Sequence, residues 1–296
     1  MRDCKLIATI PAMTDLDKVR KIISSPYIYG VRWNTGIVSP YSVDVTLDIL
    51  KEIAEEYKKI LWVDIKGRQL RVDEWGNPLY SAIKLNHSVK VDGKARVKLR
   101  GEPLLELVGV NGREIFVNPL PRHAVGKGQS LNILGNVSID GYLTDLDIQY
   151  LKCCSKKGIL NIMASFVEDR QDIQDILNID NRFEIVCKIE SEKGIKNVSD
   201  FYDCSLMAAR DDLYIELQDY QKMEYSLQKI IMQDAKAICA SRIFTSLEHS
   251  DMISYSDFED LEHMYSLGYR YFMLCDNVSN YCFEQALNGW GRFIYV

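Results

Sequence analysis

A lysine and a glutamate two positions apart, Lys188 and Glu190, end a run of apolar residues that is typical of a β-strand. Residues two apart on a strand point to the same side, so the ammonium and the carboxylate face the same space. Asp212 comes just after the next apolar run, where its carboxylate could meet that of Glu190. Two such carboxylates make an oxygen-rich site that suits Mg²⁺ or Mn²⁺. The alternative is an ordinary salt bridge at a strand end, because paired surface ions are common in proteins.

The rest of the chain alternates short apolar runs, rich in β-branched residues, with amphipathic segments, which is the pattern of repeated β-α units. Amphipathic spacing predicts helices over 15–23 and 43–57, and Thr144 with the acids behind it opens another. Eight such units favour a (β/α)8 barrel, an α/β fold whose sites lie at the carboxyl ends of the strands. We expect the eight strands at 5–10, 28–34, 60–65, 159–163, 183–189, 204–208, 237–240 and 271–274.

One long stretch, residues 72–140, breaks this alternation. It contains two dipeptides that favour tight hairpin turns, Asp92-Gly93 and Asn111-Gly112, each flanked by residues with strand character. The stretch is therefore expected to fold as a small β-rich insert after the third strand.

Glycines punctuate residues 126–135, and this segment is expected to return the chain to the barrel. The predicted domains are a barrel of residues 1–71 and 141–296 and an insert domain of residues 72–140. Since such inserts can gate a site, we expect this one to act as a lid that excludes water when substrate binds.

The composition excludes several classes of function. A net charge of -6 and a pI near 5.4 give no broad basic field, so nucleic acid is not expected as a partner. The beginning of the chain lacks the pattern of a signal peptide, and no apolar run is long enough to span a membrane, so we expect a cytoplasmic protein without a membrane partner.

Cysteine and histidine give no sign of a metal cluster. The eight cysteines stand mostly in apolar runs and never as a CxxC pair, so reduced core thiols are expected rather than disulfides or a zinc site. His87, His123, His249 and His263 have no spacing that suggests metal ligation or a catalytic pair, and we expect them to be structural or exposed.

The order of several segments resembles the pyruvate kinase family over nearly the whole chain. The matching segments are KLIATIPAM, VRWNTG, ILWVDIKGRQLR, KGQSLNILG with LTDLDIQYL, MASFVEDRQDI, CKIESEKGIKN, MAARDDL and ICASRI. Each fragment alone is a weak signal, whereas their common order is specific. The resemblance implies the barrel with an inserted domain, and no counterpart of the carboxy-terminal domain of the family is expected.

The resemblance also implies roles for individual residues. Glu190 and Asp212 match the acids that hold the divalent metal, and Lys188 matches a lysine that stabilises charge on the phosphoryl group in transfer. Arg32 matches an arginine that positions this group, a task that suits the planar fork of a guanidinium. Ser241 stands where the family has a threonine near the enolate carbon, and it retains the hydroxyl.

Asn34 and Asp64 match oxygen ligands of a monovalent cation, K⁺, in the family, and Asn34 is also expected beside the substrate. Two departures weaken the expectation of K⁺, because Gly36 replaces a serine and Ile65 replaces a threonine that would also donate oxygen. The resemblance thus implies a divalent metal more strongly than a monovalent one.

The nucleotide and carboxylate sides differ more from the family. Lys66 and Arg71 match basic residues near the nucleotide phosphates, although solvated loop residues would look the same. Asp211 and Tyr214 replace glycines whose N–H groups approach the substrate carboxylate, so Asp211 is expected to border the substrate and to repel an anion unless it binds metal or turns outward. ATP or ADP binding is therefore expected less firmly than metal binding.

Three functions stay open. The first is metal-dependent phosphoryl transfer or enolate chemistry on phosphoenolpyruvate, pyruvate or a related acid, which would make the chain a transferase with an altered substrate. The second is a metal-dependent lyase or aldolase that uses a pyruvate-type enolate, because barrels exchange chemistries readily. The third is a catalytically weak binding or regulatory relative. Each implies a small-molecule partner, and a homo-oligomer stays open.

Overall fold

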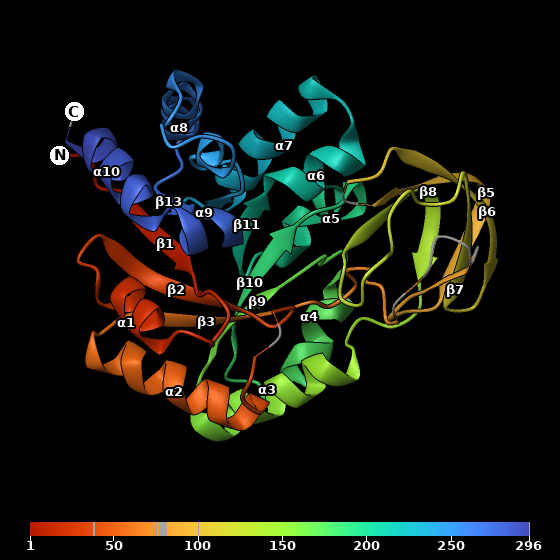
Figure 1. Ribbon diagram of the computed structural model, residues 1–296, viewed down its shortest axis with the longest axis horizontal. Helices are drawn as coiled ribbons and strands as arrows, with labels where there is room; N and C mark the ends of the chain where they lie inside the picture. The colour runs from red at the N-terminus through yellow and green to blue at the C-terminus, as the bar shows by residue number, and fades with distance from the viewer. Residues whose placement is uncertain (38, 75, 77–81, 100, 296) are drawn as a thin grey trace. The chain divides into compact units, whose positions relative to one another are not determined.

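The computed structural model describes residues 1–37, 39–74, 76, 82–99 and 101–295 (Figure 1). The chain forms two compact units. The first combines Met1–Ile65 with Asp147–Val296, and the second is Lys66–Leu146. The insert expected over 72–140 lies inside the second unit, and its bounds stay a prediction.

The first unit is a closed barrel of eight parallel strands, as predicted for the fold class. In the order around the barrel the strands are β1 (Lys5–Thr9), β13 (Tyr271–Met273), β12 (Ile238–Ala240), β11 (Ser205–Ala209), β10 (Glu184–Ile189), β9 (Asn161–Ala164), β3 (Ile60–Ile65) and β2 (Ile28–Asn34). The first and last strands close the ring, with Lys5 opposite Tyr271. The structure therefore confirms a (β/α)8 barrel.

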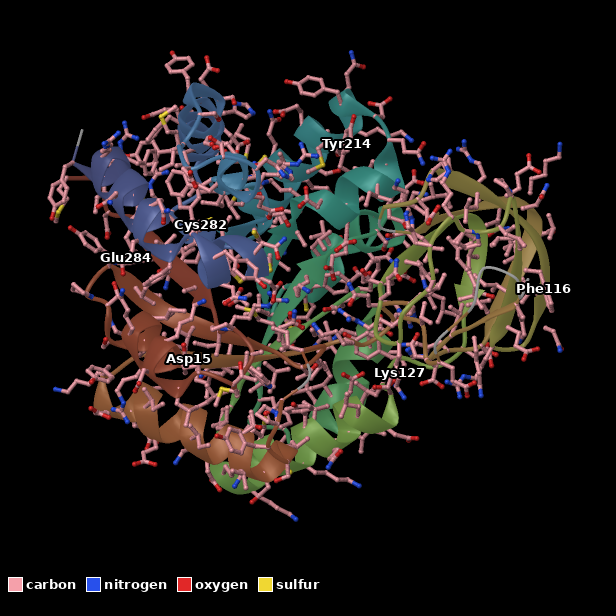
Figure 2. The ribbon with its side chains drawn as sticks, in the orientation of Figure 1. Asp15, Phe116, Lys127, Tyr214, Cys282 and Glu284 are labelled. Atoms are coloured by element: carbon pink, nitrogen blue, oxygen red, sulfur yellow. The ribbon has the colours of Figure 1, made fainter. Side chains whose placement is uncertain are left out.

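Helices surround the strands, with α2 and α3 along one side of this unit and α7 and α8 along the opposite side (Figure 1). Side-chain caps start several of them: Asp15 accepts from the N–H of Lys18 at the start of α1, where Figure 2 labels it, and Ser42 does the same for Val45 in α2. The helices are α1 (Leu16–Ser24), α2 (Val43–Glu56), α3 (Asp145–Lys157), α4 (Arg170–Leu177), α5 (Glu192–Lys196), α6 (Arg210–Leu217), α7 (Tyr220–Gln233), α8 (Tyr255–Leu267), α9 (Asp276–Tyr281) and α10 (Phe283–Ile294), with 3₁₀ turns η1 (Val198–Phe201) and η2 (Thr245–Glu248).

An apolar layer fills the barrel near the middle of its strands. It comprises Ile7, Trp62, Met163, Val186, Met207, Ile238, Ala240 and Met273, all buried. On β2 the residue at the level of this layer is Gly30. A Cβ at this position would lie 2.8 Å from the carbonyl oxygen of Ile60 and would overlap the Trp62 ring. The absence of a side chain at this position lets the indole fill the interior.

The second unit contains a five-stranded antiparallel sheet in the order β4-β7-β6-β5-β8. Its strands are β4 (Ala82–Lys84), β5 (Val89–Leu99), β6 (Leu104–Asn111), β7 (Glu114–Asn118) and β8 (Leu131–Ile139). The unit has a hydrophobic core of its own, in which Val97, Leu105 and Ile115 are fully buried. Phe116 on β7, labelled in Figure 2, lies on the sheet opposite Ala82.

Two local predictions about this unit need correction. Asn111-Gly112 does turn the chain between β6 and β7, but Asp92-Gly93 lies within β5 and forms no hairpin. The pairing of β5 with β8 shifts register after Asp92, so the glycine, at φ +82°, makes an irregularity in a long strand. The segment 126–135 does not return to the barrel either, because its last residues begin β8, which pairs with β5.

Among the helices of the described residues, none combines the length and the apolar character needed to cross a membrane.

Candidate functional site

A polar layer lies inside the barrel at the carboxyl end of the strands. It arises from the strand period, because a residue two positions after a core residue points to the same side. Ile7 is followed in this way by Thr9, Trp62 by Asp64, Met163 by Ser165 and Val186 by Lys188, and on β2 the pair is Gly30 and Arg32. All five of these polar residues are buried. The barrel thus stacks a charged layer directly on an apolar one.

The guanidinium of Arg32 makes the first buried ion pair of this layer. Its Nε donates to Oδ2 of Asp64 over 2.7 Å, and Nη2 contacts the same oxygen. Its Nη1 donates to the Thr9 hydroxyl over 3.2 Å. Burial alone would lower the pKa of Arg32, but the negative charges of Asp64 and Asp276 outweigh it and raise the pKa. The side chain is therefore a permanent, fixed cation.

Asp276, at the start of α9, completes the surroundings of Arg32 and was not predicted. Its Oδ2 accepts from Nη1 of Arg32 over 3.2 Å, and its Oδ1 accepts from Nδ2 of Asn34 over 3.0 Å. The other end of the Asn34 amide accepts from the N–H of Gly36 over 3.0 Å. The signal that could have found Asp276 is an acid directly behind the eighth strand, where barrel side chains face the site.

Lys188 connects the two halves of the polar layer. Its Nζ donates to the Ser165 hydroxyl over 2.7 Å, and it lies 3.2 Å from Oε1 of Glu190 and 3.5 Å from Oδ1 of Asp64. Burial lowers the pKa of Lys188, but the charges of Asp64 and Glu190 exceed that effect and raise the pKa overall. The ammonium is accordingly held in its charged form.

Glu190 is buried beside that ammonium. Burial raises its pKa to about 7, a shift that Lys188 opposes and the charge of Asp212 reinforces. Its Oε2 accepts from the backbone N–H of Phe166 over 2.7 Å. The carboxylate is thus oriented by the Phe166 N–H and by the ammonium of Lys188.

Asp212 lies in the first turn of α6, after β11. Strand β11 pairs with β10, whose last residue precedes Glu190. Its charge acts on both Lys188 and Glu190, as the pKa shifts of those two groups record. In the part of the chain that the structure describes, no three His, Cys, Asp or Glu side chains gather as a metal-holding group. Mg²⁺ often needs only one or two carboxylates because it keeps several waters. The donor chemistry of Glu190 and Asp212 therefore fits Mg²⁺ or Mn²⁺.

Asp211, in the first turn of α6, forms an ion pair with Arg242. Its Oδ1 accepts from Nε of Arg242 over 2.9 Å, and both side chains are about half exposed. The same guanidinium lies over the ring of Tyr214, on α6 in Figure 2, at 5.2 Å from the ring centre. The extra negative charge expected from Asp211 is thus offset by a neighbouring cation, and its expected place beside the substrate stays a prediction.

Ser241 follows β12 in a left-handed backbone conformation, at φ +66°. Its carbonyl oxygen accepts from Nη2 of the buried Arg210 over 2.6 Å. The guanidinium of Arg210 is itself gripped by both carboxylate oxygens of Asp260, at 2.7 and 2.8 Å. These contacts fix the backbone that carries the Ser241 hydroxyl.

Lys66 and Arg71 belong to the second unit. The guanidinium of Arg71 donates to the carbonyl of Gly128 over 2.7 Å and to the Gln69 side chain over 3.0 Å. Their expected contacts with nucleotide phosphates stay a prediction.

The structure brings most of the predicted residues of the first unit into one network. Hydrogen bonds, ion pairs and charge effects connect six of them: Arg32, Asn34, Asp64, Lys188, Glu190 and Asp212. Asp64 forms ion pairs with two internal cations, Arg32 and Lys188, and its expected role as a ligand of K⁺ stays a prediction. Sequence reasoning missed Thr9, Ser165 and Asp276, which supply hydrogen bonds to that network.

Comparisons with known proteins agree with this architecture. The family model described as pyruvate kinase, barrel domain, matches residues 105–277, more than half of the chain. A pyruvate kinase of Methanocaldococcus jannaschii is 23% identical over 248 residues, which cover 73% of this chain and 51% of that protein. A pyruvate kinase of Encephalitozoon cuniculi is 30% identical over 145 residues, which cover 46% of this chain and 33% of that protein. One of Lactobacillus delbrueckii subsp. bulgaricus is 22% identical over 255 residues, which cover 73% of this chain and 43% of that protein. The chain spans about half or less of the length of these curated relatives. With its closed barrel and the matching family model, the chain belongs to the pyruvate kinase family.

Proposed function

We propose that this chain is a metal-dependent enzyme that stabilises the enolate of pyruvate or a related 2-oxo acid. The observation that carries the proposal is the buried ammonium of Lys188, 3.2 Å from Glu190 and within the field of Asp212. A fixed cation beside a metal-binding pair is the arrangement that favours negative charge developing on a carbonyl oxygen. Family membership supports the same class of chemistry.

Glu190 and Asp212 would hold Mg²⁺ or Mn²⁺, which when bound polarises the carbonyl group of a 2-oxo acid. The carbon–hydrogen bond next to that carbonyl breaks and its electron pair forms the carbon–carbon double bond of the enolate. The π electrons of the carbonyl move to its oxygen, and a water molecule takes the proton. Lys188 stays protonated throughout and stabilises the oxygen as charge grows. Because the polar layer around it is buried, this electrostatic effect is stronger than in water.

Phosphoryl transfer between phosphoenolpyruvate and ADP is the second candidate. The retained guanidinium of Arg32 favours it, since this group suits phosphoryl oxygens. The same guanidinium already forms ion pairs with Asp64 and Asp276, however, so a phosphoryl anion at Arg32 would be repelled by these two carboxylates. This repulsion makes enolate formation the better supported activity.

The test compares two rates in one preparation. With Mn²⁺ and pyruvate in deuterium oxide, proton NMR follows exchange of the methyl protons, and a coupled assay follows phosphoryl transfer from phosphoenolpyruvate to ADP. We expect the exchange to be the faster reaction. Lys188→Met should lower it by about 10² or more, the usual contribution of one electrostatic stabiliser. Lys5→Met, at the opposite end of a barrel strand, is the matched control and should leave exchange unchanged.

Other results point elsewhere. Phosphoryl transfer at about 1 to 100 per second, faster than exchange, would make the chain a kinase of the ordinary kind. Exchange accompanied by cleavage of a longer 2-oxo acid would indicate a lyase or aldolase. Neither exchange nor transfer would leave a binding or regulatory relative.

A further inference from the structure

Asp276 contacts two side chains at once at the carboxyl end of the barrel. One carboxylate oxygen accepts from Arg32 Nη1 over 3.2 Å and the other from Asn34 Nδ2 over 3.0 Å. Arg32 and Asn34 lie on the same face of β2, two positions apart. Asp276 therefore spans both donors as a small bidentate anion would.

The place of Asp276 in the fold makes this contact accessible to ligands. Arg32 is buried, with 9% of its side chain exposed, whereas 43% of the Asp276 side chain is exposed. Asp64 contacts Arg32 from inside the barrel and has no exposed side-chain surface. The exposed carboxylate thus contacts the cation from the side that solvent and small molecules can reach.

We propose that Asp276 is a specificity-determining residue, whose carboxylate competes with phosphoryl anions for Arg32 and so selects acids without a phosphoryl group. The choice of 2-oxo acids as the accepted class rests on the proposed function, but the competition at Arg32 does not. A phosphoryl group carries more negative charge than a carboxylate, and at this position it would meet both Asp64 and Asp276. A ligand bound through a metal at Glu190 and Asp212 has no such need of Arg32.

A purely structural role for Asp276 makes a different prediction. Asp276 follows β13 and contacts β2, while β1 lies between these two strands. If Asp276 only joins the end of β13 to β2, its loss would lower the stability of the fold and would change the affinities of all ligands alike. Selectivity between a phosphorylated and an unphosphorylated acid therefore separates the two roles.

The experiment measures binding of phosphoenolpyruvate, and separately of oxalate, by calorimetry with Mn²⁺ at constant ionic strength. The variant is Asp276→Asn, which keeps the shape and removes the charge. We expect phosphoenolpyruvate to bind at least about tenfold tighter to this variant, as removal of a close like charge predicts, and oxalate affinity to change less than about threefold. Asp3→Asn removes the same charge from an exposed position paired with Lys5 and should change neither affinity.

A second arm tests whether Asp276 acts through Arg32. In an Arg32→Met background the gain in phosphoenolpyruvate affinity from Asp276→Asn should fall below about twofold, because the contested cation is gone. The proposal is overturned if Asp276→Asn leaves the ratio of the two affinities unchanged, whether or not the thermal midpoint falls. A selectivity shift without proton exchange in the NMR assay would uphold the proposal and refute the enolate function, and exchange without a shift would do the reverse.

Discussion

The ammonium of Lys188 lies 3.2 Å from the carboxylate of Glu190, and neither side chain has more than 7% of its surface exposed. Lys188 lies near the end of β10 and Glu190 directly follows its last residue, so the spacing of two residues sets them on one side. A buried pair of this kind is a small gain in stability at most, because desolvation opposes the attraction. The proposed function gives the pair another role, in which it prepares a place for a bound metal ion.

The first prediction concerns that metal ion. Mn²⁺ should bind with Glu190 and Asp212 as ligands, and the double variant Glu190→Gln, Asp212→Asn should bind it at least about 10² times more weakly, because two charged ligands are lost. Calorimetry measures the affinity. Glu192→Gln with Asp251→Asn changes the same residue types at exposed positions and should bind Mn²⁺ normally. Undiminished binding in the first double variant would show that the metal site lies elsewhere.

The second prediction follows from the pKa of Glu190, raised to about 7 from the ordinary 4.5. In metal-free protein the folded state binds this proton more tightly than the unfolded state does. The stability that Glu190 contributes is therefore full below pH 4.5 and is lost as the pH rises to about 7. The loss amounts to a few kcal/mol at most.

Denaturant titrations of the wild type and of Glu190→Gln, with a chelator present, isolate this effect because the other groups titrate alike in both. The unfolding free energy of the wild type, relative to that of Glu190→Gln, should fall as the pH rises from 4.5 to about 7 and should stay constant above that pH. A constant difference across that range would mean that Glu190 keeps an ordinary pKa in the folded protein.

The third prediction concerns the second unit, which has its own core. Leu105 on β6 is fully buried, whereas 60% of Val108 on the same strand is exposed. Leu105→Ala should lower the unfolding free energy by about 2 to 5 kcal/mol, and Val108→Ala by less than about 0.5 kcal/mol. Hydrogen exchange should speed up within residues 66–146 in Leu105→Ala and stay unchanged in the barrel peptides. Equal acceleration in both units would show that they unfold together.

The fourth prediction compares two arginine–aspartate pairs of the barrel. Arg210 is buried and pairs with Asp260, 28% of whose side chain is exposed, while Arg242 and Asp211 are about half exposed. Asp260→Asn leaves a buried cation with less compensation and should lower the unfolding free energy by about 1 to 3 kcal/mol. Asp211→Asn should change it by less than about 1 kcal/mol. Chemical denaturation measures both unfolding free energies. Equal decreases in the two variants would show that the burial of the arginine does not determine the effect.

Local sequence patterns were sufficient for the barrel strands. β2 and β3 begin and end where their β-branched and aromatic runs predict, because parallel barrel strands are buried on both faces. The same reasoning places Lys188 and Glu190 on one side of β10, which their ion pair confirms. These features depend on spacing within one segment.

Features that depend on several segments were missed. Asp276 reaches Arg32 only because the barrel closes β13 against β1 and so brings the end of the chain near β2. Asp92-Gly93 has the composition of a turn, yet β5 continues through it because β8 pairs with both of its halves. In each case the deciding partner lies tens of residues or more away, where local propensity carries no information.

Arg210 has a consequence for protein engineering. It starts α6, but its guanidinium is held by Asp260 of α8 and in turn holds the backbone of the loop after β12, where Ser241, Arg242 and Phe244 all adopt left-handed conformations. Such conformations are unfavourable for residues other than glycine unless neighbours impose them. A chimera that exchanged only the segment after β11 with another barrel would therefore leave this loop without its clamp. The sixth and seventh β-α units have to be transplanted as one block.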